Sequence, residues 1–145
     1  MKILVINGPN LNMLGVRDVA HYGVKTLKDI EVLMQEKSLA LGAILEFFQS
    51  NHEGFIVDFI QENYTLASGI IINPGALTHY GLSMRDALED TKLPIVEVHL
   101  SDIHSREEFR KISVVEEIGL KQISGIGWNG YIEALEYLVE YLKKG

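Results

Sequence analysis

Three short runs of this chain consist almost entirely of Ile, Val and Leu, and they restrict the possible folds more than any other feature. They are "KILVIN" (2–7), "GIIIN" (69–73) and "IVEVHL" (95–100). Near-continuous apolar runs of this length are typical of strands whose two faces are both covered by helices. Two further strands are predicted at 43–49 and, more weakly, at 122–125. The chain therefore predicts a buried sheet of five strands.

Helical patterns separate these strands. Apolar residues recur at helical spacing in 25–41, 53–63, 85–90 and 131–144. Alternation of strands and helices predicts a parallel sheet between two helical layers. At 145 residues the chain fits one domain, residues 1–145. We predict a flavodoxin-like three-layer α/β sandwich with a five-stranded parallel sheet.

Composition excludes several classes of protein. The chain has no cysteine, which excludes disulfides and thiolate sites and favours a cytoplasmic location. Its net charge of −7 argues against nucleic-acid binding. No apolar run approaches the roughly 18–20 residues that span a bilayer, and "MKILVING" is interpreted as a strand, not a signal peptide. The hydrophobic fraction of 47% suggests that other copies of the chain cover part of the surface.

The segments that follow three of the strands carry most of the candidate chemistry. In open α/β sheets, ligands bind outside the carboxyl ends of the strands. The segments there are "NGPNLNMLGVRDVAHYG" (7–23), "NPGALTHYG" (73–81) and "EVHLSDIHSREEFR" (97–110), and they hold four of the five histidines. We therefore expect the functional site where these three segments meet.

In the third segment, Glu97 and His99 are two positions apart on a strand, so their side chains point the same way. A carboxylate beside an imidazole fixes its tautomer and prepares it to give or take a proton. The alternative is a hydrogen-bonded structural histidine near a strand end. The backbone N–H groups of Leu100 and Ser101 follow, and such groups can hold an anion.

Other side chains of these segments have a functional and a structural interpretation. Arg106 and Arg110 share a face if the segment is helical, and arginine suits carboxylate ligands; the alternative is a solvated face with Glu–Arg pairs. Asn73 ends a central strand in a turn signal, and His79 follows it, so both can bond a hydroxylated ligand. Asp86 is by default a surface charge.

The first segment contains a possible base. A tyrosine is a poor base at neutral pH because its usual pKa is about 10, but a nearby guanidinium stabilises the phenolate. Arg17 and Tyr22 could form such a pair on a loop that closes over a substrate, and Asn10 could direct its amide towards the pocket. The alternative is that Tyr22 only anchors the loop against the core. No metal-binding spacing and no nucleotide-binding glycine loop occurs in the sequence.

Taken together, "INGPNLNMLG", "QSNHEG", "INPGALTH", "RDAL", "IVEVHLS" and "HSREEFR", in this order and spacing, closely resemble the type II 3-dehydroquinate dehydratases. The closing "GIGWNGYIEALEYL" is similar to the last strand and helix of that family. The resemblance implies a flavodoxin-like enzyme that removes water from 3-dehydroquinate, the third step of the shikimate pathway. It also implies anti elimination through an enol or enolate, without metal, organic cofactor or Schiff base.

The resemblance assigns the chemical steps to residues of two segments. Tyr22 is implied as the base that abstracts the C2 proton, with Arg17 activating it. Asn10 is implied to position a water that stabilises the enolate. His99 is implied as the general acid for the departing C1 hydroxyl, and Glu97 orients it.

The resemblance also assigns the binding of the substrate. The backbone N–H groups of Leu100 and Ser101 are implied to hold its carboxylate. Asn73, His79 and Arg110 are implied to bond the ring hydroxyls.

Two further assignments concern support and assembly. Arg106 is implied to lie close to the residues that bond the hydroxyls. An aspartate at the place of Asp86 reaches the site of a neighbouring subunit in the family, whose trimers assemble into dodecamers.

The sequence departs from the family pattern at three places. Asp18-Val19 stands where Glu-Pro is usual, Tyr80-Gly81 where Thr-Ser is usual, and Asp102 where Asn is usual. The first is expected to loosen the loop, and the second to reshape the hydroxyl pocket.

Two other functions remain alternatives. One is a non-catalytic module that binds small hydroxy acids, which would need no base. The other is a flavin- or nucleotide-binding protein, which the missing phosphate loop disfavours.

Overall fold

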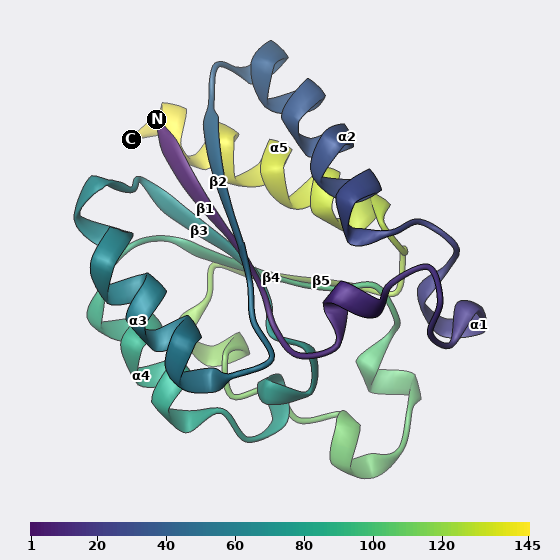
Figure 1. Ribbon diagram of the computed structural model, residues 1–145. Coiled ribbons are helices and arrows are strands. Elements are labelled where there is room, and N and C mark those ends of the chain that lie inside the picture. The colour runs from purple at the N-terminus through teal and green to yellow at the C-terminus, as the bar shows by residue number, and fades with distance from the viewer.

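The computed structural model describes residues 1–145, apart from the side chain of His21. Its centre is a five-stranded sheet, all parallel, with strand order β2-β1-β3-β4-β5. Figure 1 shows this twisted sheet crossing the middle of the molecule. The strands are β1 (Lys2–Asn7), β2 (Ile44–Gln49), β3 (Gly69–Asn73), β4 (Ile95–His99) and β5 (Lys121–Ser124). The predicted flavodoxin-like sandwich is confirmed, and each strand bound lies within one residue of its predicted position.

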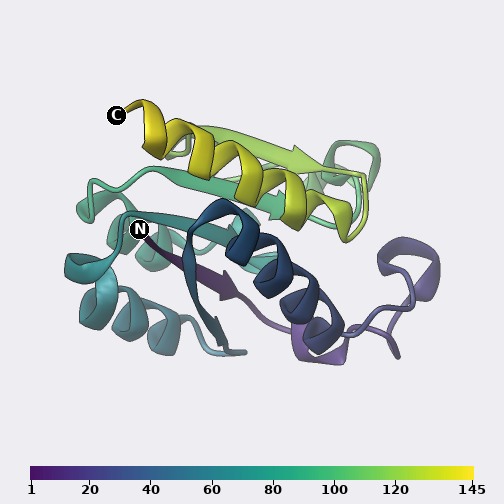
Figure 2. The ribbon, with the colours of Figure 1, turned by 90° about the horizontal axis from the view of Figure 1, so that it is seen from above.

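Two helices cover each face of the sheet. Helices α2 (Leu27–Leu41) and α5 (Asn129–Lys144) pack together on one face, and α3 (Glu53–Asn63) and α4 (Leu82–Asp90) on the other. Both views show the α2–α5 pair on one side of the sheet and the α3–α4 pair on the opposite side (Figures 1 and 2). The three layers follow from the alternation of strands and helices in the sequence.

The burial of β1 shows why its four middle positions are all apolar. Ile3 and Val5 belong to the core beneath α2 and α5, whereas Leu4 and Ile6 belong to the core beneath α3 and α4. All four are fully buried. Side chains alternate between the faces of a strand, so a strand covered on both sides contains no exposed position.

Local contacts explain where two helices begin. Thr26 and Asp29 form a capping box, which starts α2 at Leu27 instead of the predicted 25. Helix α4 begins at Leu82, three residues before the prediction, and its Met84 N–H donates to Glu53 Oε2 of α3 at 3.0 Å. A carboxylate at the start of a helix accepts from a free backbone N–H group and interacts favourably with the positive end of the helix dipole.

The segments at the carboxyl ends of the strands contain short helical turns. Helix α1 (Val19–Tyr22) lies within the segment after β1, for which the sequence predicted a loop. After β4, two 3-10 turns (Ile103–Ser105 and Glu108–Arg110) replace the continuous helix considered for 106–110. None of the described helices is long and apolar enough to cross a membrane.

The turns after β1 and β3 are packed backbone against backbone. Gly8 donates its N–H to Asn73 O at 2.8 Å, and a Cβ on Gly8 would lie 2.2 Å from Pro74 O. Gly75 has φ +59, and a Cβ there would lie 2.8 Å from Pro9 O. Only glycine permits this approach, which fixes the rim of the pocket described next.

Candidate active site

A pocket of about 140 Å³ opens at the carboxyl ends of β1, β3 and β4. Ten of the twelve site residues proposed from sequence line it: Asn10, Arg17, Tyr22, Asn73, His79, His99, Leu100, Ser101, Arg106 and Arg110. The other two are Glu97, which lies directly behind His99, and Asp86. The position matches the crevice at which open parallel sheets bind ligands.

His99 and Glu97 form a buried pair at the end of β4. The His99 Nε2 and Glu97 Oε1 atoms are 2.7 Å apart, and the two side chains are 6% and 0% exposed, respectively. An ionised carboxylate only accepts hydrogen bonds, so Nε2 of His99 carries the proton. Nδ1 is then the ring nitrogen that remains for a ligand in the pocket.

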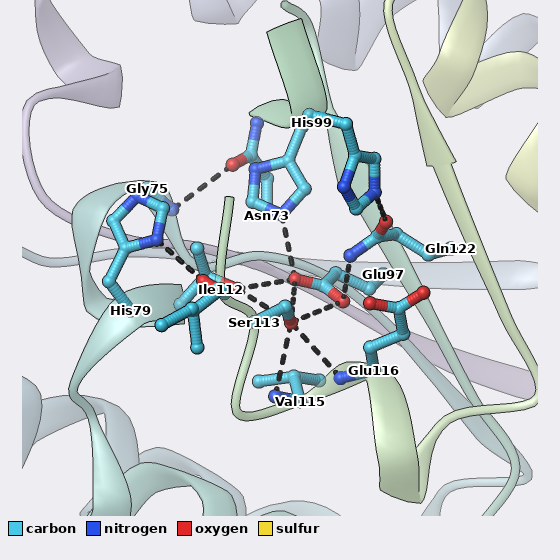
Figure 3. A network of polar contacts seen from close by, with 12 residues as sticks. Asn73, Gly75, His79, Glu97, His99, Ile112, Ser113, Val115, Glu116 and Gln122 are labelled. Atoms are coloured by element: carbon cyan, nitrogen blue, oxygen red, sulfur yellow. Dashed lines mark hydrogen bonds and ion pairs between the residues drawn. The ribbon is translucent and has the colours of Figure 1, made fainter. Parts of the chain in front are cut away.

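Three further side chains hold the carboxylate of Glu97 in place, and two of them, Ser113 and Gln122, are labelled in Figure 3. Thr78 donates to Oε1, Ser113 lies 2.8 and 2.9 Å from the two oxygens, and Gln122 donates its Nε2–H to Oε2 at 2.9 Å. Burial by itself raises the pKa of Glu97. The hydrogen bond and charge of His99, with the donors Thr78 and Gln122, outweigh burial and lower that pKa below its usual value. Glu97 is therefore a charged, fixed acceptor behind His99.

The hydroxyl of Tyr22, another part of the pocket lining, contacts two guanidinium groups. Arg106 Nη1 donates to it at 2.9 Å, and Arg17 Nη2 lies at 3.4 Å, with the Arg17 guanidinium 4.3 Å from the centre of the ring. Arg106 was expected only near the residues that bond the hydroxyls, yet it is the nearer donor to Tyr22. The Tyr22 ring also packs against the core, so it anchors its segment as well.

Asn73 is held from behind by a fully buried tyrosine. Its Nδ2 donates to the Tyr131 hydroxyl at 2.9 Å, and that hydroxyl donates to Asn7 Oδ1 at 2.6 Å. The Oδ1 of Asn73 accepts from the N–H of Gly75 at 3.1 Å. Because burial raises the pKa of Tyr131, its hydroxyl stays protonated. Asn73 is left with one amide hydrogen for a ligand.

His79 and Arg110 also have one side engaged by the protein. His79 Nδ1 lies 2.6 Å from Ile112 O, and since a carbonyl only accepts, Nδ1 donates and Nε2 remains as an acceptor. Arg110 Nε pairs with Glu107 at 2.9 Å, so the Glu–Arg pair considered as the alternative is present while Arg110 also lines the pocket.

The segment "QSNHEG" supports the other rim of the pocket. Asn10 has a left-handed backbone (φ 70), and its N–H donates to Asn51 Oδ1 at 2.9 Å. Gln49 donates its Nε2 to both Gly8 O and Asn51 Oδ1, at 3.2 Å each. Asparagine tolerates this backbone conformation better than most residues. These contacts hold the backbone of Asn10 in place and so set the direction of its side chain.

Known proteins with similar sequences and structures decide the family. The family description "Dehydroquinase class II" matches residues 1–139. This chain belongs to that family. The family's members are 3-dehydroquinate dehydratases, which are hydro-lyases, so the chain is an enzyme of that class.

Similar proteins cover nearly the whole chain. A 3-dehydroquinate dehydratase of Roseiflexus castenholzii is 55% identical over 139 residues, which are 96% of this chain and 88% of that protein. One of Halothermothrix orenii is 51% identical over 144 residues, 99% of this chain and 97% of that protein. The crystal structure of type II dehydroquinase from Butyrivibrio crossotus has a TM-score of 0.93 at 48% identity, covering 95% of this chain and 97% of that one.

The departures from the family pattern lie around the pocket, not in it. Tyr80 is 64% exposed and is not part of the lining, so it does not crowd the pocket. Asp102 Oδ1 accepts from His104 N–H at 3.0 Å, a bond that an asparagine oxygen makes equally well. Asp18 and Val19 stand at the start of α1, on the segment that carries Tyr22.

Asp86 does not contribute to the pocket of its own chain. It is exposed on α4 and is absent from the lining. Thr78, Ser113 and Gln122 are the residues that sequence reasoning missed. The quoted segments contain Thr78 next to His79, but nothing in the sequence marks Ser113 or Gln122. Among the described residues, no group of three or more His, Asp or Glu lies together in a metal-binding cluster.

Proposed function

We propose that this class II dehydroquinase dehydrates 3-dehydroquinate to 3-dehydroshikimate by anti elimination through an enolate, in the shikimate pathway. Family membership supports the overall dehydration. The proposal for the mechanism rests on one observation: a tyrosine bonded by guanidinium groups and a histidine bonded by a carboxylate line the same pocket.

Tyr22 is the proposed base. The guanidinium groups of Arg106 and Arg17 bond its oxygen and can stabilise the negative charge of the phenolate that acts as the base. The phenolate takes the C2 proton next to the C3 ketone, and the electron pair of the C–H bond forms the enolate. Asn10 holds a water against the developing oxyanion, which is the usual electrostatic support for such a step.

His99 is the proposed acid. Its Nε2–H is directed at Glu97, so a proton on Nδ1 is the one available for the C1 hydroxyl. As the enolate collapses, the C1–C2 double bond forms, the C1–O bond breaks and water leaves with the His99 proton. Tyr22 and His99 return to their starting states by exchange with solvent.

The remaining lining residues are proposed to bind the substrate. The backbone N–H groups of Leu100 and Ser101 hold its carboxylate. Asn73 donates, His79 accepts and Arg110 donates to ring hydroxyls, which act as both donors and acceptors. These donor and acceptor roles match the atoms of each side chain that the protein itself leaves without a hydrogen bond.

Assembly and location complete the proposal. We expect a dodecamer built from trimers, in which Asp86 reaches a neighbouring subunit's site from the exposed side of α4. The lack of cysteine supports a cytoplasmic location. No metal, organic cofactor, nucleic acid or membrane takes part in the proposed reaction.

An ultraviolet assay of the conjugated enone product tests the reaction and its residues. The unmodified enzyme should form the product, whereas Tyr22→Phe and His99→Ala should each lose about 10²–10⁴-fold in kcat. Tyr64→Phe removes a hydroxyl remote from the pocket and should leave kcat unchanged.

Each outcome has a distinct meaning. No product from the unmodified enzyme would refute the reaction, and a fully active Tyr22→Phe variant would refute only the base. EDTA, and borohydride added with the substrate, should not inactivate the enzyme. Inactivation by borohydride would indicate a Schiff base instead of the enolate mechanism.

A further inference from the structure

A continuous chain of hydrogen bonds joins the buried acid to the molecular surface. His104 Nε2 lies 2.9 Å from Gln122 Oε1, and Gln122 Nε2 lies 2.9 Å from Glu97 Oε2. The other oxygen of Glu97 bonds His99. His104 is exposed on the 3-10 turn Ile103–Ser105, whereas Glu97 is fully buried (Figure 3 shows the inner part). Four side chains from β4, β5 and the turn after β4 are thereby linked.

The direction of every bond in this chain is fixed. The charged carboxylate of Glu97 only accepts, so the amide group of Gln122 must present Nε2 inward and Oε1 outward. Oε1 only accepts as well, so His104 must carry a proton on Nε2. This donor is the Nε2–H group of the ring.

We propose that Gln122, held by His104, is a positioning residue that fixes Glu97 and, through it, the acid His99. The inference rests on the proposed function, because it concerns the orientation of the proposed acid. Oε2 of Glu97 has two donors, Gln122 and Ser113, and without Gln122 only the Ser113 hydroxyl holds that oxygen. The carboxylate can then rotate, and the angle at which His99 meets the substrate is no longer fixed.

The surroundings agree with a positioning role. Gln122 and His104 are not part of the pocket lining; they border a separate shallow hollow with Glu116, Lys121 and Glu133. They have no access to substrate and can act only through Glu97.

Kinetics of four variants test the proposal. Gln122→Met keeps the length of the side chain but removes the donor, and we expect kcat to fall about ten- to a hundredfold with KM within about threefold. His104→Leu should lose about three- to tenfold in kcat. His104→Gln places a donor near the position of Nε2 and should stay within about twofold. Glu133→Gln, in the same hollow, breaks only the 3.7 Å pair with Lys121 and should be unchanged.

A double variant and a spectrum complete the test. His104→Leu with Gln122→Met should be no slower than Gln122→Met alone, because His104 acts only through Gln122. In ¹⁵N-histidine NMR of the unmodified enzyme, neutral His104 should be the Nε2–H tautomer, and in Gln122→Met that preference should disappear.

Several results would overturn the inference: a Gln122→Met kcat within twofold of normal, multiplicative losses in the double variant, or an Nδ1–H tautomer of His104. If Gln122→Met does not fold, the surface variants of His104 and the tautomer decide the question. The tautomer does not depend on catalysis. An unmodified enzyme without enone product would therefore refute the proposed function and leave this measurement intact.

Discussion

Replacing Tyr131 by Phe removes one oxygen atom from the interior of the enzyme and leaves two polar groups without a partner. The Tyr131 side chain is fully buried, and its hydroxyl donates to Asn7 Oδ1 and accepts from Asn73 Nδ2. Each buried neutral group left unsatisfied costs about 1–3 kcal/mol, and the saved burial of the hydroxyl offsets part of this. We expect Tyr131→Phe to lower the free energy of unfolding by about 2–4 kcal/mol at pH 7.

The pH dependence of this difference provides the sharper test. Burial raises the pKa of Tyr131 in the folded enzyme, whereas in the unfolded chain the tyrosine titrates near its usual value of about 10. Because the pKa of Tyr131 is higher in the folded enzyme, its contribution to the free energy of unfolding is complete below pH 10 and is lost as the pH rises above 10. The free energy of unfolding of the unmodified enzyme should fall by about 1.4 kcal/mol per pH unit relative to the variant. At pH 11.5 the difference should be about 2 kcal/mol smaller than at pH 7.

Urea unfolding at equal protein concentration measures both quantities. Tyr141→Phe is the matched control, because it removes the same atom from the exposed side of the same helix, where the tyrosine is 47% exposed. It should change stability by less than about 0.5 kcal/mol at every pH. A Tyr131→Phe difference below 1 kcal/mol at pH 7, or one that stays constant to pH 11.5, would refute this account of the hydroxyl.

Two further predictions concern the support of the site. Ser113→Ala removes a hydroxyl that lies within 2.9 Å of both oxygens of Glu97, so kcat in the enone assay should fall about tenfold, and an unchanged kcat would contradict the role of this contact. The same hydroxyl accepts from the N–H groups of Val115 and Glu116, so urea unfolding should also show a loss of about 1–3 kcal/mol. Gly75→Ala and Gly42→Ala both place alanine at a positive φ, but only the Cβ at position 75 meets a backbone atom. Urea unfolding should therefore give a loss of about 1 kcal/mol for Gly42→Ala and at least about 3 kcal/mol for Gly75→Ala, and equal losses would show that Pro9 moves aside.

The sequence predicted those parts of the site that follow from local geometry. Glu97 and His99 share a face because side chains alternate along a strand, and this holds in any environment. The convergence of three segments followed from the rule that parallel strands end at the same edge. The two helical layers were predictable because apolar periodicity records which faces are buried.

The missing parts depend on contacts between distant segments. Ser113 and Gln122 approach Glu97 from 16 and 25 residues away, and their residue types are common on any surface. Arg106 reaches Tyr22 across 84 residues, along a path set by two short 3-10 turns that the apolar pattern does not record. The place of Asp86 in an assembly depends on surfaces of other subunits.

The position of β1 has a consequence for how the chain is made. This strand is synthesised first, yet it lies inside the sheet and pairs with β2 on one edge and β3 on the other. At the usual rate of translation, residues 69–73 follow it after roughly 3–13 seconds. During that time a strand of "KILVIN" has at least one unpaired edge and two apolar faces that α4 and α5 do not yet cover, a state that favours association with other chains. The nascent chain should therefore be most prone to aggregation before β3 emerges, and a ribosome-bound fragment ending near residue 60 should bind chaperones more strongly than one ending after α5.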